Sequence, residues 1–83
     1  MNPPAETIPQ RVLAYELRAA IDVARDQRAP TPNRWAANAR IARLVTENPK
    51  GWRSTHVRLR LGMSRYAWLW EFNLRLRKRS GRA

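Results

Sequence analysis

Apolar residues recur with a helical period along the first part of the chain. They stand three or four positions apart, while arginines and aspartates occupy the opposite side. The apolar stripe consists of Leu13, Leu17, Ala20, Ile21 and Ala24. Thr7 is placed to cap this segment, and Pro9 falls in its first turn, where a missing N–H is tolerated. The pattern predicts a scaffold helix over residues 8–28.

A second helical stripe follows a proline-rich break at 29–33. Thr31 and Pro32 repeat the cap-and-proline signal of a helix start, and the run Asn-Pro-Lys-Gly at 48–51 is a typical stop. The apolar residues between these signals are Ala37, Ile41, Leu44 and Val45. We therefore expect a second helix over residues 32–47.

The stretch from 54 to 79 fits two secondary structures. At period two, apolar residues alternate with arginines, which is typical of a basic β-hairpin joined through residues 62–66. At period 3.6, the same stretch forms a short helix capped by Ser54 or Thr55, a turn and a final helix. Helix propensity favours the second interpretation, and neither earlier segment offers a strand to pair with a hairpin. The predicted fold is all-α, a small bundle of about four helices, and two helices plus a hairpin are the alternative.

The predicted turn between the last two helices lies at Leu61-Gly62-Met63-Ser64-Arg65. Gly62 can adopt the positive φ of a sharp reversal, Met63 would fill the angle between the helices, and Ser64 would cap the second helix. Over about twenty residues, this segment resembles a helix-turn-helix DNA-binding module. Arg58 departs from the motif, which usually has a small residue there.

The resemblance implies that the final helix presents its first residues to the major groove of DNA. Arg65 would then bind guanine and Asn73 adenine, because their side chains match those base edges. Neighbouring basic residues would bind phosphate, which positions the protein without reading sequence. The predicted nucleic-acid-binding set is Lys50, Arg53, Arg58, Arg60, Ser64, Arg65, Tyr66, Asn73 and Arg77.

Four tryptophans raise the question of what they pack against. Trp68 and Trp70 are two residues apart, so a helix points them about 200° apart, and only Trp68 joins the core stripe. The other side of the helix is a candidate homodimer or partner interface, and packing within the chain is the alternative. That side carries Tyr66, Trp70 and Leu74. We expect Trp35 and Trp52 to cover edges of the core, with stacking on single-stranded bases as the alternative.

The net positive charge is confined to the second part of the chain. Residues 1–33 contain four arginines and four acids, whereas residues 34–83 contain thirteen basic residues and two acids. The whole net charge of +11 therefore lies in the second part. A field this one-sided indicates a polyanionic partner: nucleic acid, an anionic membrane surface or an acidic protein.

The sequence offers little material for catalysis. Cysteine is absent and His56 is the only histidine, so we expect no enzymatic activity, no metal, no cofactor and no small-molecule substrate. The longest run of large apolar residues is too short for a membrane span, and the start lacks a secretory signal. We expect a cytoplasmic, nucleoid-associated single domain over 1–83, with a flexible N-terminus at 1–7 and a basic tail at 80–83.

These features together predict a small basic DNA-binding protein that reads the major groove. Bacterial or phage-type transcription regulators and recombination accessory factors are the expected class, and double-stranded DNA is the expected partner. The first alternative is a small modulator or inhibitor that docks on a host protein. The second is an RNA-binding protein, which the hairpin interpretation would favour.

Overall fold

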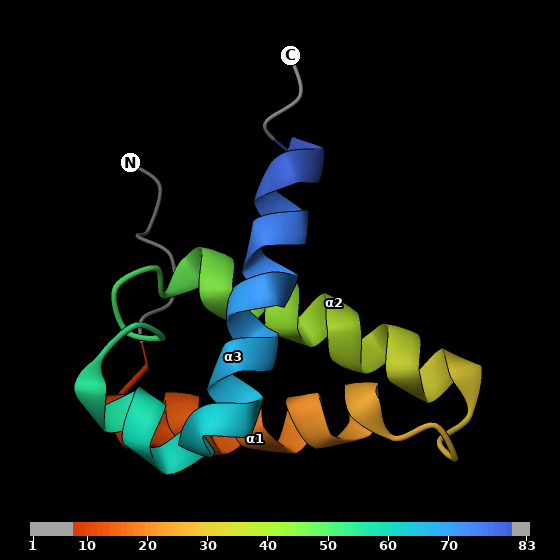
Figure 1. The fold of residues 1–83 in the computed structure, drawn as a ribbon, viewed down its shortest axis with the longest axis horizontal. Coiled ribbons are helices and arrows are strands. Elements are labelled where there is room, and N and C mark those ends of the chain that lie inside the picture. Colours follow the sequence, from red (N-terminus) through yellow and green to blue (C-terminus); the bar gives the residue numbers. More distant parts are fainter. Residues whose placement is uncertain (1–7, 81–83) are drawn as a thin grey trace.

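The chain forms three helices in the computed structural model, which describes residues 8–80 except the side chain of Ser80. They are α1 (Gln10–Arg25), α2 (Thr31–Glu47) and α3 (Thr55–Ser80) (Figure 1). Within residues 8–80 there is no strand, so the all-α class is confirmed and the hairpin alternative is not supported. The predicted flexible N-terminus at 1–7 lies outside the described residues, as does the predicted tail apart from the backbone of Ser80.

Helix α1 is the centre of the packing. It runs antiparallel to α2 after the turn at residues 26–30, and α3 crosses both of them (Figure 1). Every residue of the two predicted apolar stripes is buried, which confirms those faces. They are joined in the core by Ala14, Trp52, Val57, Leu61 and Leu69. The short apolar faces of the three helices thus pack together to form one small core.

The helix starts agree with the sequence signals in part. Ser54 Oγ accepts a hydrogen bond from the Val57 N–H at 3.2 Å, which confirms the predicted cap of α3. The predicted cap by Thr31 is wrong, because Pro30 takes the cap position and Thr31 is already helical. Helix α1 likewise starts after a proline, Pro9, and its predicted cap, Thr7, lies outside the described residues.

Helix α3 changes direction at Gly62. Gly62 has φ 83° and ψ 164°, a region that is essentially restricted to glycine, so the predicted positive φ is confirmed. Residues 55–61 lie near the start of α1, and residues 63–80 rise across α1 and α2 (Figure 1). The two helices predicted here meet at one residue, so three helices are formed instead of about four.

The single-residue turn changes the roles of its neighbours. Gly62 itself occupies the cap position, so Ser64 lies inside the following helix and its predicted cap is wrong. Met63 is 90% exposed, so it does not fill the angle between the two stretches. Leu61 and Leu69 are buried there instead.

Asn48 joins the connection after α2 to the start of the chain. Its buried side chain donates from Nδ2 to the Leu44 carbonyl at 3.0 Å and accepts the Ile8 N–H at 3.3 Å. Its own carbonyl accepts the Trp52 N–H at 3.2 Å. Trp52 is 1% exposed, which confirms that it covers the core, whereas Trp35 is 71% exposed and does not.

Among the described helices, none combines the length and apolar character needed to cross a membrane.

Candidate nucleic-acid interface

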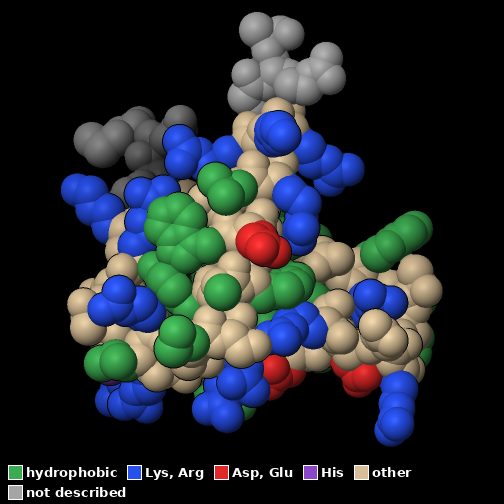
Figure 2. Space-filling view, in the orientation of Figure 1, with side chains coloured by type: hydrophobic (Ala, Val, Ile, Leu, Met, Phe, Trp, Pro, Cys, Tyr) green, Lys and Arg blue, Asp and Glu red, His purple; other side chains and the backbone are tan. Residues whose placement is uncertain are grey.

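The carboxylates of the helices are largely used in internal ion pairs. Glu16 of α1 pairs with Arg40 of α2, and Glu47 pairs with Arg43 one turn away at 3.2 Å. A third pair joins α1 to α3. Most of the other basic side chains remain at the surface without a carboxylate partner within residues 8–80, and Figure 2 shows many blue and few red side chains on one face. The segregated charge of the sequence therefore becomes a basic surface.

Arg65 forms the third ion pair, with Asp22 of α1. Its Nε lies 2.8 Å from Asp22 Oδ1 and its Nη2 lies 3.2 Å from Oδ2, while Nη1 donates to the Leu61 carbonyl at 3.3 Å. The hydrogen bond from Arg65 holds the pKa of Asp22 below its usual value of about 3.8. The same bond raises the pKa of Arg65. All three guanidinium nitrogens donate to acceptors within the protein, which leaves two of the five N–H groups of Arg65 for a further contact.

Asn73, the predicted adenine-binding residue, lies on the buried side of α3. It is 6% exposed because it stands one turn after the fully buried Leu69. Its Nδ2 is buried and has no partner within the described residues. The structure therefore does not bring Arg65 and Asn73 to a common exposed face.

The predicted partner surface divides into packed and exposed parts. Tyr66 and Trp70 are half-buried, with ring centroids 6.1 and 5.1 Å from that of Trp52. The guanidinium of Arg53 covers this cluster, 5.3 Å from the Trp52 ring and 5.4 Å from the Trp70 ring. Leu74, at 55% exposed, is the member of the predicted set that projects most into solvent. Packing within the chain thus uses much of that surface, and the interface stays a prediction.

The other predicted phosphate-binding residues lie at the surface. Lys50, Arg58 and Arg60 are exposed in the loop before α3 and in its first stretch, and Arg77 is exposed near its end. Because Arg58 is exposed, it does not occupy the packed position that the helix-turn-helix motif reserves for a small residue. Ser64 Oγ accepts a hydrogen bond from Arg25 Nη2 at 3.2 Å.

The last turns of α3 carry a basic group that the sequence analysis found only in part. We call it the basic end of α3; it consists of Arg75, Arg77, Lys78 and Arg79, all exposed. No acid follows Glu71 in the sequence. In Figure 1 this end of the helix extends beyond α2. Cations at a helix C-terminus interact favourably with the helix dipole, so this arrangement also stabilises the end of the helix.

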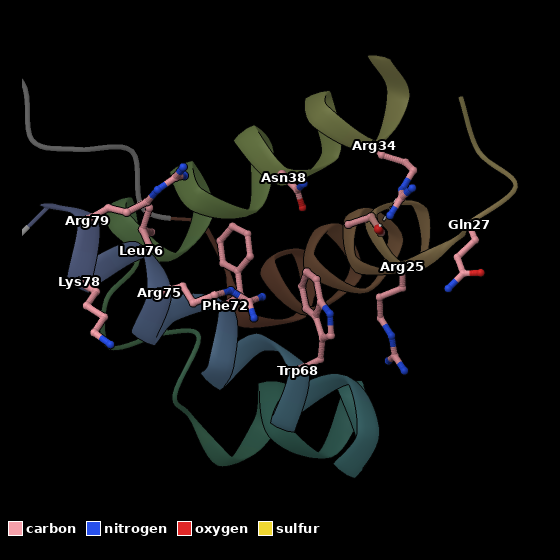
Figure 3. Close-up of a pocket in the computed structure, with 11 residues that line it drawn as sticks. Arg25, Gln27, Arg34, Asn38, Trp68, Phe72, Arg75, Leu76, Lys78 and Arg79 are labelled. Carbon is pink, nitrogen blue, oxygen red and sulfur yellow. Dashed lines mark hydrogen bonds between the residues drawn. The ribbon is translucent and has the colours of Figure 1, made fainter. Parts of the chain in front are cut away.

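A cleft of about 1250 Å³ lies between the basic end, α1 and α2 (Figure 3). Trp68 and Phe72 stack beside it, with ring centroids 5.4 Å apart and an interplanar angle of 23°. Within residues 8–80, no acidic residue lines it. The basic residues that line it are Arg25, Arg34, Arg75, Lys78 and Arg79. Sequence analysis placed Trp68 in the core stripe; Trp68 and Phe72 are both half-buried and face this cleft.

Comparison of the chain with protein-family models, with curated proteins and with solved structures finds no match in any of the three. The candidate interface is therefore defined by its own geometry and charge. Its two parts are the exposed basic end of α3 and the cleft beside it. Both can attract phosphate, and only the cleft adds aromatic rings.

Proposed function

We propose that the protein binds nucleic acid through phosphate contacts, with double-stranded DNA as the main partner and the basic end of α3 as the main contact. One observation carries this proposal. Four exposed cations occupy the last turns of a helix that extends from the body, and no acid follows Glu71 in the sequence. The major groove of B-form DNA is wide enough to accommodate an exposed α-helix.

The contacts would position the protein more than they read sequence. Arginine and lysine side chains bind phosphate oxygens on any sequence, and base reading needs free side chains at base edges. Arg65 is paired with Asp22, and Asn73 is buried. We therefore propose a small regulator or recombination accessory factor that holds DNA chiefly by its backbone.

Two matched variants test the location of the contact. The basic-end variant replaces Arg77, Lys78 and Arg79 with Gln. The α1 control variant replaces Arg11 and Arg18 of α1 and Arg28 of the turn after it with Gln. Each removes the same charge from exposed positions. Binding of a fluorescent DNA duplex should fall more than about tenfold in the basic-end variant and much less in the control. Equal losses would mean that only net charge matters, and absence of binding by the wild type would refute the proposal.

A duplex RNA of the same length separates the DNA and RNA alternatives. The major groove of A-form RNA is too narrow and deep for side chains to read, so insertion of α3 favours DNA. We expect weaker binding of duplex RNA than of duplex DNA at equal salt. Stronger binding of RNA would favour the RNA-binding alternative instead.

A protein partner is the second candidate, because α3 also exposes apolar side chains. Leu59 is 74% exposed and Met63 90% exposed, and both lie outside the core. Apolar side chains (green) are visible together with basic ones on the face in Figure 2. Sedimentation equilibrium of the purified protein tests the homodimer form of this candidate. A dimer that dissociates in a Leu59→Gln, Met63→Gln variant would support it.

A further inference from the structure

The cleft beside the basic end combines an aromatic surface with unpaired positive charge. Trp68 and Phe72 point from α3 toward α2, where Asn38 faces them (Figure 3). Their rings stack on each other, so together they present a continuous apolar surface at half-buried positions. A surface of this kind favours a flat ring as its ligand.

The basic residues around these rings form no ion pair with a carboxylate within residues 8–80. Arg34 Nε donates to the Ala24 carbonyl at 3.4 Å, and Arg25 donates to the Ser64 hydroxyl, so both have neutral partners. Within residues 8–80, the ion pairs with carboxylates use Arg40, Arg43 and Arg65, none of which lines the cleft. The ligand that completes the cleft therefore carries negative charge as well as flat rings.

The size of the cleft indicates a chain rather than a single small molecule. Pockets for small ligands commonly enclose about 300–1000 Å³. This cleft is larger, at about 1250 Å³, and five of the described residues that line it are cations. In duplex DNA the bases stack on each other and their faces are covered, whereas an unpaired strand can offer base faces and phosphates together.

We propose that this cleft is a subsite for unpaired nucleotides of a single-stranded nucleic acid. Bases stack on Trp68 and Phe72, while Arg75 and Arg79 hold the flanking phosphates. Asn38 offers an amide that can hydrogen-bond a base edge. This inference rests on the proposed nucleic-acid binding and adds a class of ligand to it: a strand with accessible bases, bound beside the duplex contact.

An abasic strand isolates the contribution of the bases. Fluorescence anisotropy is measured with three labelled ligands of about 12 nucleotides or base pairs: oligothymidylate, an abasic deoxyribose-phosphate strand and a duplex. The two single strands carry the same charge, so they differ only in the bases. We expect the wild type to bind oligothymidylate about tenfold or more tightly than the abasic strand.

Tryptophan substitutions inside and outside the cleft provide matched variants. Trp68→Leu should remove most of the preference for bases, whereas Trp35→Leu, at the exposed position on α2, should retain it. Phe72→Leu tests the same surface with a smaller change in volume, and circular dichroism verifies that each variant is folded. If Trp68→Leu does not fold, Phe72→Leu carries the test alone.

Four other outcomes would overturn the inference. Equal affinity of the wild type for the thymidylate and abasic strands would refute the cleft subsite, while nucleic-acid binding would stand. Loss of the preference in Trp35→Leu alone would place the stacking on α2. Tighter binding of an acidic peptide with phenylalanines than of oligothymidylate would make the cleft a peptide site. Failure to bind any of the three nucleic-acid ligands would refute the proposed function as well.

Discussion

Arg65 of α3 donates two hydrogen bonds to Asp22 of α1, from Nε to Oδ1 at 2.8 Å and from Nη2 to Oδ2 at 3.2 Å. The two residues are 43 positions apart in the sequence. The ion pair connects residues 63–80 of α3 to α1, just after the turn at Gly62. It also means that a residue expected to bind DNA has a structural role in the isolated chain. The ion pair is partly exposed, with 29% of the Arg65 side chain and 51% of the Asp22 side chain accessible. Its contribution to stability is accordingly small.

Replacement of Arg65 separates the structural role from base reading. Arg65→Gln should lower Tm by at most a few degrees and leave duplex affinity nearly unchanged, because the charge of the guanidinium is already paired with that of Asp22. Thermal denaturation and anisotropy titration measure the two effects. A large loss of affinity for one DNA sequence and not for others would show that Arg65 leaves Asp22 to bind a base.

The pH dependence of stability follows from the lowered pKa of Asp22. Since the pKa in the folded state lies below that in the unfolded state, the ionised carboxylate stabilises the fold above about pH 4. This contribution is lost as the pH falls through the lowered folded-state value. The difference in unfolding free energy between the wild type and Asp22→Asn should therefore be constant near neutral pH and shrink in acid. Urea titrations over this range measure it, and a difference that grows on acidification would contradict the assigned pairing.

Substitution of Gly62 tests whether the positive φ at the turn contributes to the stability of the fold. A Cβ at this position would meet no atom within 4 Å, so an L-residue adds backbone strain without a steric clash. Gly62→Ala should lower the unfolding free energy by about 1–3 kcal/mol. A synthetic chain with D-alanine at 62 is the matched control, because a D-residue favours positive φ, and it should be as stable as the wild type. Equal destabilisation by the two alanines would refute the strain explanation.

Asn73 provides a second test of base reading. Its buried Nδ2 has no partner among the described residues, so an apolar side chain of similar volume removes an uncompensated polar group. Asn73→Leu should be neutral or raise the unfolding free energy by about 1 kcal/mol, with DNA binding unchanged. Urea denaturation and duplex titration check both points. A selective loss of affinity for adenine-containing sites would restore the predicted role of Asn73.

The buried faces of the helices could be predicted because they depend on the spacing of residues that are close together in the sequence. Leu13, Leu17 and Ile21 repeat at helical spacing and are all fully buried, and Ser54 stands where a cap is required. The turn at Gly62 could also be predicted, since few residues other than glycine tolerate its backbone angles. Local periodicity alone could not choose between helix and hairpin for the last stretch, and there helix propensity and capping were the better guide.

The arrangement of the side chains in space could not be predicted in the same way. The pairing of Arg65 with Asp22 depends on how α3 crosses α1, which no local pattern contains. Asn73 was expected to be accessible because the helix-turn-helix resemblance implies an exposed recognition helix there, yet its place one turn after Leu69 buries it. The cleft combines residues of three helices, so its only sequence signal is the one-turn spacing of Trp68 and Phe72.

The salt dependence of duplex binding tests the central claim most directly. Each phosphate contact makes the slope of log affinity against log salt concentration more negative by about 0.9, so about six contacts give a slope near −5. The basic-end variant, which lacks Arg77, Lys78 and Arg79, should have a slope shallower by about 2 to 3, whereas the α1 control variant should stay within about 1 of the wild type. Equal slopes for the wild type and the basic-end variant would contradict the claim that the end of α3 holds the phosphates.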